Sequence, residues 1–253
     1  MPTPTLTVGA PCWVDLYSSD VERAKTFYGE LFGWAAEASA PELGGYFVFT
    51  KDGRSVAGCM PNDGAQGYPD GWTIHLLTDD AERTAAAARA NGGVVHFDPM
   101  QVAENGVTTM IGDPGGATVG AWQPGAQRGF DVIGEPGAPS WFELHTNAYD
   151  ACVDFYRDVF GWDARTMSDA PEFRYTTLGE GDDARAGILD ASALSDGSPA
   201  SWTVYFGVDD ADAALEQVAA LDGRVVRPAE DTPYGRLAQA ADPTGALFRI
   251  VAG

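Results

Sequence analysis

The sequence has few basic residues, and lysine occurs only at Lys25 and Lys51. Lysine and arginine together number 15, against 37 aspartate and glutamate residues, so the formal net charge is −22 at pH 7. A surface of this sign repels nucleic-acid phosphates and anionic lipid headgroups. We therefore expect neither a nucleic acid nor a membrane as a partner.

Cysteine is also scarce, and long apolar runs are absent. Cys12, Cys59 and Cys152 are scattered without a CxxC pair, which predicts reduced thiols. No run approaches the roughly 18–20 apolar residues that a membrane span needs. The first residues, MPTPTLTVGAPCW, lack the basic and apolar segments of a secretory signal, so we expect a cytoplasmic protein. GxSxG, P-loop and HExxH motifs are missing as well.

What the sequence does contain is an internal repeat. WVDLY begins at Trp13 and FYGELFGW ends at Trp34, and matching segments return with the same spacing at Trp141 and Trp162. WTIHLLTDD and WTVYFGVDD form a second matching pair, and DPGG and DPTG form a third. Matching landmarks at a nearly constant offset indicate that the second half of the chain duplicates the first.

Each half divides again into two strand–helix–strands units. Polar caps and glycine stops predict helices over 21–31, 81–90, 150–159 and 211–221. A segment rich in glycine and proline, 125–137, predicts a linker. The expected domains are therefore residues 8–124 and 138–253.

The opening strand of each unit has two faces, because side chains alternate along a strand. One face is apolar throughout and is expected to pack under the helices: Val14, Leu16, Ile74, Leu76, Phe142, Leu144, Val204 and Phe206. The other face mixes rings with polar groups: Trp13, Asp15, Tyr17, Thr73, His75, Leu77, Trp141, Glu143, His145, Thr203, Tyr205 and Gly207. Burying unpaired carboxylates in a core is costly. This second face predicts a partly desolvated pocket, with a plain wet sheet face as the alternative.

The pattern D-x-x-x-A-x-x-F-Y-x-x-x-F-G-W after the first strand, with DPxG before the last, resembles the vicinal oxygen chelate superfamily of glyoxalases, bleomycin-resistance proteins and dioxygenases. The resemblance covers nearly the whole chain and extends to the two-domain, glyoxalase-like actinobacterial members. It implies an α+β fold of four tandem βαβββ modules, which form two domains with curved mixed sheets. Because the superfamily includes isomerases, dioxygenases, thiol transferases and sequestering proteins, it implies no single activity.

The metal enzymes of this superfamily place a His or Glu in the opening strand of a module and a Glu in its last strand. Carried over one by one, these positions fall on residues that are poor metal ligands: Trp13, Gly58, Thr73, Gly120, Trp141, Gly187, Thr203 and Arg249. A guanidinium at the last of these would repel a cation. The resemblance therefore predicts that the usual metal is missing, and we expect no cofactor.

Two polar groups are candidate acid–base sites. Asp15 and His75 lie on opening strands of paired modules and are expected to meet. They fit a general base with its orienting carboxylate, a ligand contact, a shifted metal site, or a structural cross-strand pair.

Glu143, His145 and Tyr205 form the second group, and Arg249 is expected to pair with Glu143 and hold it ionised. That group fits either a pocket for a carboxyl, hydroxyl or carbonyl group, or an internal ion pair in a degenerate pocket.

Several rings and hydroxyls complete the candidate ligand contacts: Trp13, Tyr17, Thr73, Trp122, Trp141 and Thr203, with Arg249. Trp34, Trp72, Trp162 and Trp202 are assigned to the core, and His96 to a structural role.

We expect a protein that binds a small apolar molecule, aromatic or carbonyl-bearing, in natural-product metabolism or self-resistance. The first alternative is a lyase, isomerase or oxygenase-type enzyme using Asp15/His75 or Glu143/His145/Tyr205. The second is a structural or interaction protein in which these pockets are vestigial. The expected partner is a small-molecule ligand or substrate, and the expected state is a monomer or homodimer.

Overall fold

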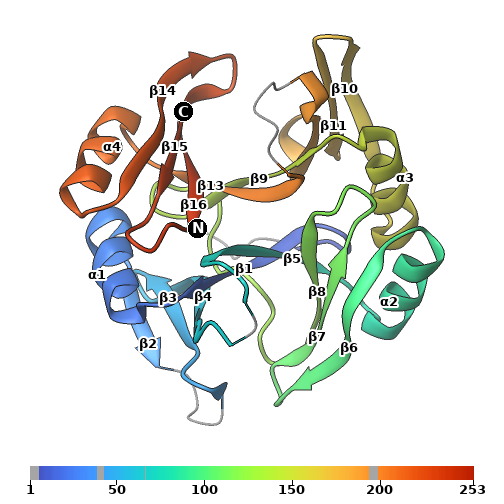
Figure 1. Cartoon of the computed structure of the whole chain (residues 1–253), viewed down its shortest axis with the longest axis horizontal. Coiled ribbons are helices and arrows are strands. Elements are labelled where there is room, and N and C mark those ends of the chain that lie inside the picture. The colour runs from blue at the N-terminus through green and yellow to red at the C-terminus, as the bar shows by residue number, and fades with distance from the viewer. Residues whose placement is uncertain (1–5, 39–42, 66, 194–198) are drawn as a thin grey trace.

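The computed structural model describes residues 6–38, 43–65, 67–193 and 199–253. These residues form two eight-stranded sheets, one from each half of the chain (Figure 1). The predicted α+β fold class, with two domains of mixed sheets, is confirmed. No helix among the described residues is long and apolar enough to cross a membrane.

The first sheet has the strand order β2-β3-β4-β1-β5-β8-β7-β6. Its central strands β1 and β5 are antiparallel, and each has a parallel neighbour, β4 or β8, from its own module. Both modules of the first half therefore share one sheet. Its strands are β1 (Pro11–Ser18), β2 (Ala35–Ala38), β3 (Phe47–Lys51), β4 (Arg54–Pro61), β5 (Gly71–Leu77), β6 (Val94–Val102), β7 (Gly106–Gly112) and β8 (Thr118–Pro124).

The second sheet repeats this arrangement in the order β10-β11-β12-β9-β13-β16-β15-β14. Modules thus pair within each half, a point that the sequence left open. Its strands are β9 (Pro139–Thr146), β10 (Ala164–Ala170), β11 (Phe173–Leu178), β12 (Ala186–Asp190), β13 (Ser201–Gly207), β14 (Arg224–Thr232), β15 (Gly235–Ala241) and β16 (Leu247–Ala252).

Four α-helices lie within a residue of the predicted ranges: α1 (Val21–Phe32), α2 (Ala81–Ala90), α3 (Tyr149–Phe160) and α4 (Ala211–Ala220), counted over the described part of the chain. The side chain of Asp20 accepts a hydrogen bond from the backbone of Arg23 and so caps α1. Gly33 ends the same helix at φ 73°, a conformation that glycine adopts without strain.

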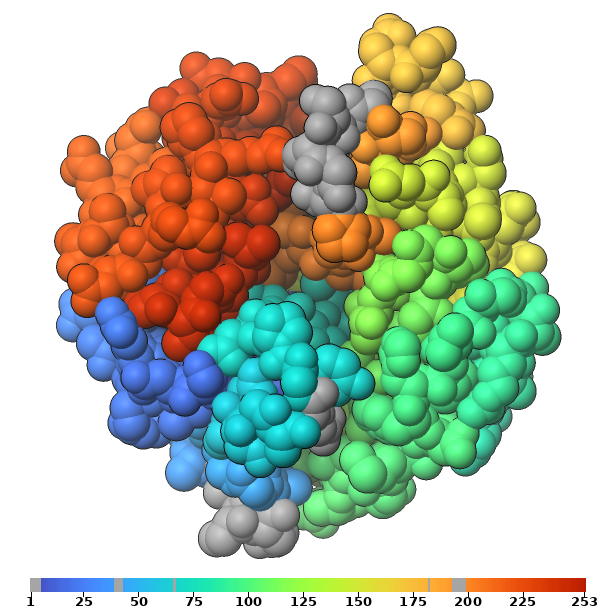
Figure 2. Space-filling view, in the orientation of Figure 1, coloured from blue at the N-terminus to red at the C-terminus, as the bar shows by residue number. Residues whose placement is uncertain are grey.

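The helices join the two halves. Helix α1 packs against α4, and α2 packs against α3 (Figure 1). In Figure 2 the blue region of α1 accordingly lies beside the orange region of α4, and the green region of α2 beside the yellow region of α3. The eight strand residues predicted to pack under the helices are at most 3% exposed. One continuous apolar core therefore spans both halves.

Two reciprocal hydrogen bonds connect the repeated motifs across the halves. Tyr28 of α1 donates to Asp242 in the DPTG turn over 3.1 Å. Tyr156 of α3 donates to Asp113 in the DPGG turn over 3.0 Å. Each tyrosine oxygen also accepts an indole N–H, from Trp72 or Trp202. The FYxxxFGW and DPxG motifs are thus complementary parts of the contact between the halves.

The predicted linker 125–137 is packed and does not run free. Phe130 and Val132 are 1% and 2% exposed. The backbone N–H of Phe130 donates to the backbone carbonyl of Cys12, and the carboxylate of Glu135 forms a bidentate ion pair with Arg54. This segment is therefore part of the core between the halves.

Candidate functional site: two cups with one plan

The face of each sheet that points away from the helices carries most of the predicted site residues. We term these faces the first cup (β1–β8) and the second cup (β9–β16). In the first cup, Asp15 lies between Gly58 and Thr73 in the strand register, and His75 lies between Trp13 and Gly120. The register places these side chains on one face.

The structure brings Asp15 and His75 together. Oδ2 of Asp15 lies 3.0 Å from Nε2 of His75. The other carboxylate oxygen accepts the indole N–H of Trp13 over 3.0 Å and the hydroxyl of Tyr46 over 2.9 Å. Both side chains are largely buried, at 18% and 10% exposure, so the pair sits in a desolvated environment where electrostatic interactions are strong.

Tyr46 was missed by the sequence analysis. It lies directly before β3, outside the opening strands that the alternation of side chains singled out. A Cβ added to Gly58 would come within 2.0 Å of its hydroxyl, so the glycine provides the space for this ring. Its counterpart in the second half is Tyr175, which occupies the space beside Gly187 in the same way. Aligning the repeats beyond the opening strands would have revealed both.

The remaining nitrogen of His75 has no partner among the described residues. Nδ1 is buried, and it faces Gly120, where a Cβ would lie only 2.1 Å away. A glycine in β8 is therefore what allows this imidazole to fit next to Asp15.

The rest of the first cup is mostly apolar. One row across the sheet runs from His75 through Gly120 and Met110 to Phe97, in register. A parallel row contains Leu77, Trp122, Thr108 and Met100. Phe97 and Met100 are 39% and 54% exposed, so this face presents large apolar side chains to solvent. Trp122 is half-buried and its indole donates to the backbone of Gln127.

Trp13 does not have the role expected of it. Its ring is only 4% exposed and packs against Phe130 at 5.6 Å between centroids, so the ring is not available to stack on a ligand. It orients Asp15 instead. Tyr17 and Thr73 are half-buried on the same face.

In the second cup, Glu143 occupies the position of Asp15 and likewise holds three partners. One of its oxygens is 2.6 Å from Nε2 of His145 and accepts the Tyr205 hydroxyl over 2.7 Å. The other oxygen accepts the Tyr175 hydroxyl over 2.6 Å. Trp141 donates to Tyr175. Thr203 lies opposite Glu143 in the register and is half-buried.

Arg249 does not pair with Glu143, contrary to expectation. Its Nη1 donates to the Tyr205 hydroxyl over 2.9 Å, and that hydroxyl in turn donates to Glu143. The reason is the register: Arg249 lies opposite Tyr205, and the tyrosine hydroxyl bridges the two charged groups.

These contacts determine the protonation of Glu143. Burial on its own raises the pKa of this carboxyl, but the hydrogen bond and charge of His145 and the hydroxyls of Tyr175 and Tyr205 outweigh it and lower the pKa to about 2. Burial and the nearby Glu143 charge raise the pKa of both tyrosines. The second cup therefore contains a carboxylate that is ionised at neutral pH, with neutral phenol donors.

The positions at which the superfamily's metal enzymes carry ligands do not fit a divalent cation here. Gly58, Gly120 and Gly187 have no side chain and little room for one, and Arg249 is itself cationic. No cluster of three or more His, Cys, Asp or Glu side chains with metal-binding geometry exists among the described residues. The donors that remain, Asp15 with His75 and Glu143 with His145, are in contact with each other.

The cysteines are all buried. Burial, with a smaller contribution from Asp15, raises the pKa of Cys59 to about 12, and burial with Asp113 raises that of Cys152 to about 11. Burial also raises the pKa of Cys12. None of the three is a reactive thiolate at neutral pH.

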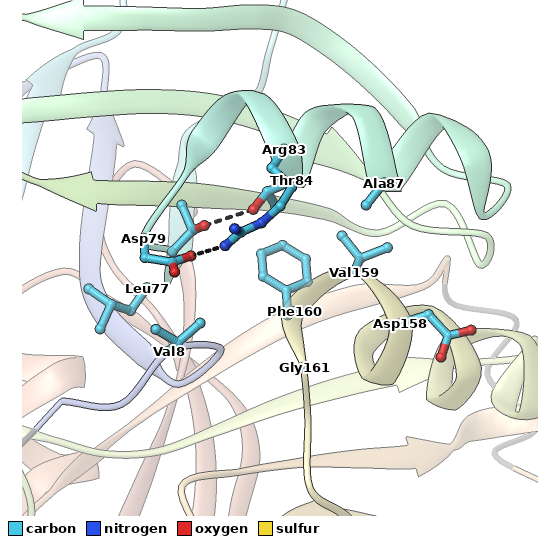
Figure 3. A pocket seen from close by; sticks show the side chains of 11 residues that line it. Val8, Leu77, Asp79, Arg83, Thr84, Ala87, Asp158, Val159, Phe160 and Gly161 are labelled. Carbon is cyan, nitrogen blue, oxygen red and sulfur yellow. Dashed lines mark hydrogen bonds and ion pairs between the residues drawn. The ribbon is translucent and has the colours of Figure 1, made fainter.

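A separate groove of about 310 Å³ lies at the junction of the halves, between α2 and α3 (Figure 3). Leu77, Ala87, Val159 and Phe160 supply apolar walls, and Arg83 at its edge is paired with Asp79. It shares Leu77 with the first cup but none of the acid–base groups.

Comparison with known proteins assigns the class that this fold and these cups define. Residues 12–120 and 139–250 each match the model of the Glyoxalase/Bleomycin resistance protein/Dioxygenase superfamily. The chain belongs to this superfamily.

Among its relatives, "Putative glyoxylase CFP32" of Mycobacterium tuberculosis is 35% identical over 248 residues, covering 96% of this chain and 94% of that protein. "Anthracycline biosynthesis protein DnrV" of Streptomyces peucetius is 35% identical over 257 residues, covering 96% and 93%. The chain therefore has relatives in anthracycline biosynthesis along its full length.

Solved structures agree on the fold. The Mn(II)-bound glyoxalase from Novosphingobium aromaticivorans has a TM-score of 0.67 at 17% identity, covering 100% of this chain and 83% of that one. The 2,3-dioxygenase LapB from Pseudomonas sp. KL28 has a TM-score of 0.67 at 14% identity, covering 99% and 94%. At these identities the likeness shows the fold alone.

Proposed function

We propose that the protein binds a small, largely apolar molecule with an aromatic ring or a carbonyl group in its first cup, without a divalent metal, as part of natural-product metabolism. The observation that carries this proposal is the composition of that cup. The exposed side chains of Phe97 and Met100, with the half-buried Met110, form an apolar surface beside a single desolvated polar pair, Asp15 and His75. Apolar walls with a few placed polar groups are typical of small-molecule sites.

The relatives support the metabolic setting. DnrV and DauV both carry the name "Anthracycline biosynthesis protein", and each covers 96% of this chain. The glycines at the metal-ligand positions support binding without a metal, because no carboxylate can be placed there without displacing Tyr46 or His75.

Calorimetric titration with 2-acetonaphthone, a neutral aromatic ketone, tests this proposal. We expect saturable binding that survives treatment with a chelator. Met110→Gln should weaken it by about three- to tenfold, since the variant removes apolar contact area from the cup. The matched control is Gln239→Met, which makes the reverse change at the equivalent place in the second cup and should leave this affinity unchanged. Loss of binding with the chelator and recovery with Mn²⁺ would overturn the metal-free proposal.

The Asp15–His75 contact also favours a second candidate, a lyase or isomerase that moves a proton. Oδ2 of Asp15 contacts only His75, whereas Oδ1 already accepts two hydrogen bonds. Asp15 would take a proton from the carbon next to a ligand carbonyl and return one to it, with His75 as the positioning residue. Glu143 is a poorer base, because its pKa of about 2 leaves it little affinity for a proton.

Deuterium exchange separates the two candidates. If the first cup is catalytic, wild-type protein should speed incorporation of deuterium from D₂O into the methyl group of 2-acetonaphthone, and Asp15→Asn should abolish that acceleration while binding persists. If exchange is equally fast with and without the protein, the first cup is not catalytic and only the binding function stands.

A further inference from the structure

The two cups differ most along one row of side chains that crosses each sheet. In the first cup this row is His75, Gly120, Met110 and Phe97. In the second cup the equivalent row is Tyr205, Arg249, Gln239 and Arg227. An apolar row has been replaced by one that carries hydrogen-bond donors and positive charge.

Arg249 is unusual among the arginines of this acidic chain. Its guanidinium lies 5.3 Å from the centre of the Tyr205 ring and makes one hydrogen bond, to the Tyr205 hydroxyl. Its Nε is buried with no partner, and it forms no ion pair with a carboxylate of the described residues. Most other arginines pair directly with an aspartate: Arg23, Arg83, Arg89, Arg157, Arg165, Arg174 and Arg236.

The one carboxylate nearby does not neutralise Arg249 directly. Both oxygens of Glu143 are taken by His145, Tyr175 and Tyr205. A half-buried guanidinium with unused N–H donors and no counter-ion is costly to maintain, and an anionic ligand would remove that cost.

The surroundings of Arg249 complete a binding site for an amphipathic anion. Gln239 lies directly opposite it in the register and adds amide donors on the same face. Leu247 and Val251 flank it two residues away along β16, and Leu247 is 47% exposed. Alternation along a strand places both of them on the face of Arg249.

We propose that the second cup binds a small organic carboxylate with an apolar body, anchored by the guanidinium of Arg249, with Gln239 as a further donor. Arg249 and a carboxylate match in geometry, because the planar guanidinium donates two parallel N–H groups to two oxygens. This site is distinct from the one proposed in the first cup, and its ligand differs in charge.

Fluorine NMR with 4-fluorobenzoate tests the inference, with 4-fluorobenzyl alcohol as the neutral analogue of the same size. Wild-type protein should bind the carboxylate saturably and more tightly than the alcohol. Arg249→Met should weaken carboxylate binding by about tenfold or more, the change expected for loss of a charge-assisted hydrogen bond, and should leave alcohol binding unaltered. Arg249→Lys keeps the positive charge but loses the planar guanidinium with its two parallel N–H donors. Its affinity for the carboxylate should therefore lie between those of wild type and Arg249→Met.

Two further measurements make the result decisive. Circular dichroism checks that each variant folds. If Arg249→Met does not fold, Arg249→Lys and Gln239→Met replace it in the test, and each should lose less affinity for 4-fluorobenzoate. Met110→Gln, the first-cup variant, should leave 4-fluorobenzoate affinity unchanged, so failure in one cup is distinguishable from failure in the other. Absence of saturable carboxylate binding to wild type, or equal affinity in wild type and Arg249→Met, overturns the inference.

Discussion

The first and second cups hold a carboxylate in the same way but surround it differently. Asp15 and Glu143 occupy equivalent positions beside a glycine, each with a nearby tyrosine that accepts an indole N–H from Trp13 or Trp141. The histidine, however, comes from β5 in the first cup (His75) and from β9 itself in the second.

This difference shows what the duplication has kept and what it has changed. The support of the carboxylate is common to both halves, because the tyrosine fills space that only a glycine leaves. The walls are free to vary, since Gly120 and Arg249 stand at equivalent positions in the last strand of their modules. We infer that the fold maintains a buried carboxylate in each half while the walls set the ligand.

The largest expected effect concerns the kind of partner that each of the two carboxylate oxygens holds: tyrosine hydroxyls contact both oxygens of Glu143, whereas one oxygen of Asp15 contacts only His75. Glu143→Gln would set an amide NH2 against a tyrosine hydroxyl at either oxygen and remove the buried charge, and it should lower the free energy of unfolding by about 3 kcal/mol. Asp15→Asn retains an acceptor oxygen for Trp13 and Tyr46 and should cost about 1 kcal/mol. Chemical denaturation of both variants measures the difference, and equal losses would contradict the distinction between the cups.

The pH dependence of stability sharpens the same comparison. The folded-state pKa of Glu143, about 2, lies below its ordinary value of 4.5, so its ionised form stabilises the fold above pH 4.5. That contribution, on the order of 3 kcal/mol, is lost as the pH falls from 4.5 towards 2. Denaturation curves of wild type and Glu143→Gln should therefore converge over this range. A constant difference between them would show that the carboxyl is not held ionised by its partners.

The smallest expected difference between the halves concerns the contacts that join them. Tyr28→Phe and Tyr156→Phe each remove one hydroxyl from the reciprocal contacts with Asp242 and Asp113, at an expected cost of about 1–2 kcal/mol. Because one core spans both halves, each variant should still unfold in a single transition seen equally by fluorescence and circular dichroism. Two separate transitions would mean that the halves are less coupled than the contacts indicate.

Much of the fold could be predicted because it depends on local patterns. Capping residues such as Asp20 and Gly33 fixed the ends of the helices, and alternation along the strands identified the buried face. The motifs that resemble the superfamily also repeat along the chain, so each half supports the assignment of the other. Contact between Asp15 and His75 followed from pairing the opening strands of two modules.

The parts that were missed depend on segments remote in the sequence. Tyr46 and Tyr175 reach their carboxylates from other strands or loops, and Phe130 covers Trp13 from a segment that composition alone marks as a linker. Alternation assigns a face to a residue but says nothing of what else packs on that face.

The sequence by itself determined the duplication, the helices, the apolar face of each opening strand and the superfamily, because these follow from periodicity and from motifs that occur twice. Only the tertiary structure decided which side chains hold each carboxylate, that Tyr205 separates Arg249 from Glu143, and that the halves share one core. Those outcomes depend on strand register and on close packing between distant segments. A pattern of residue types specifies neither.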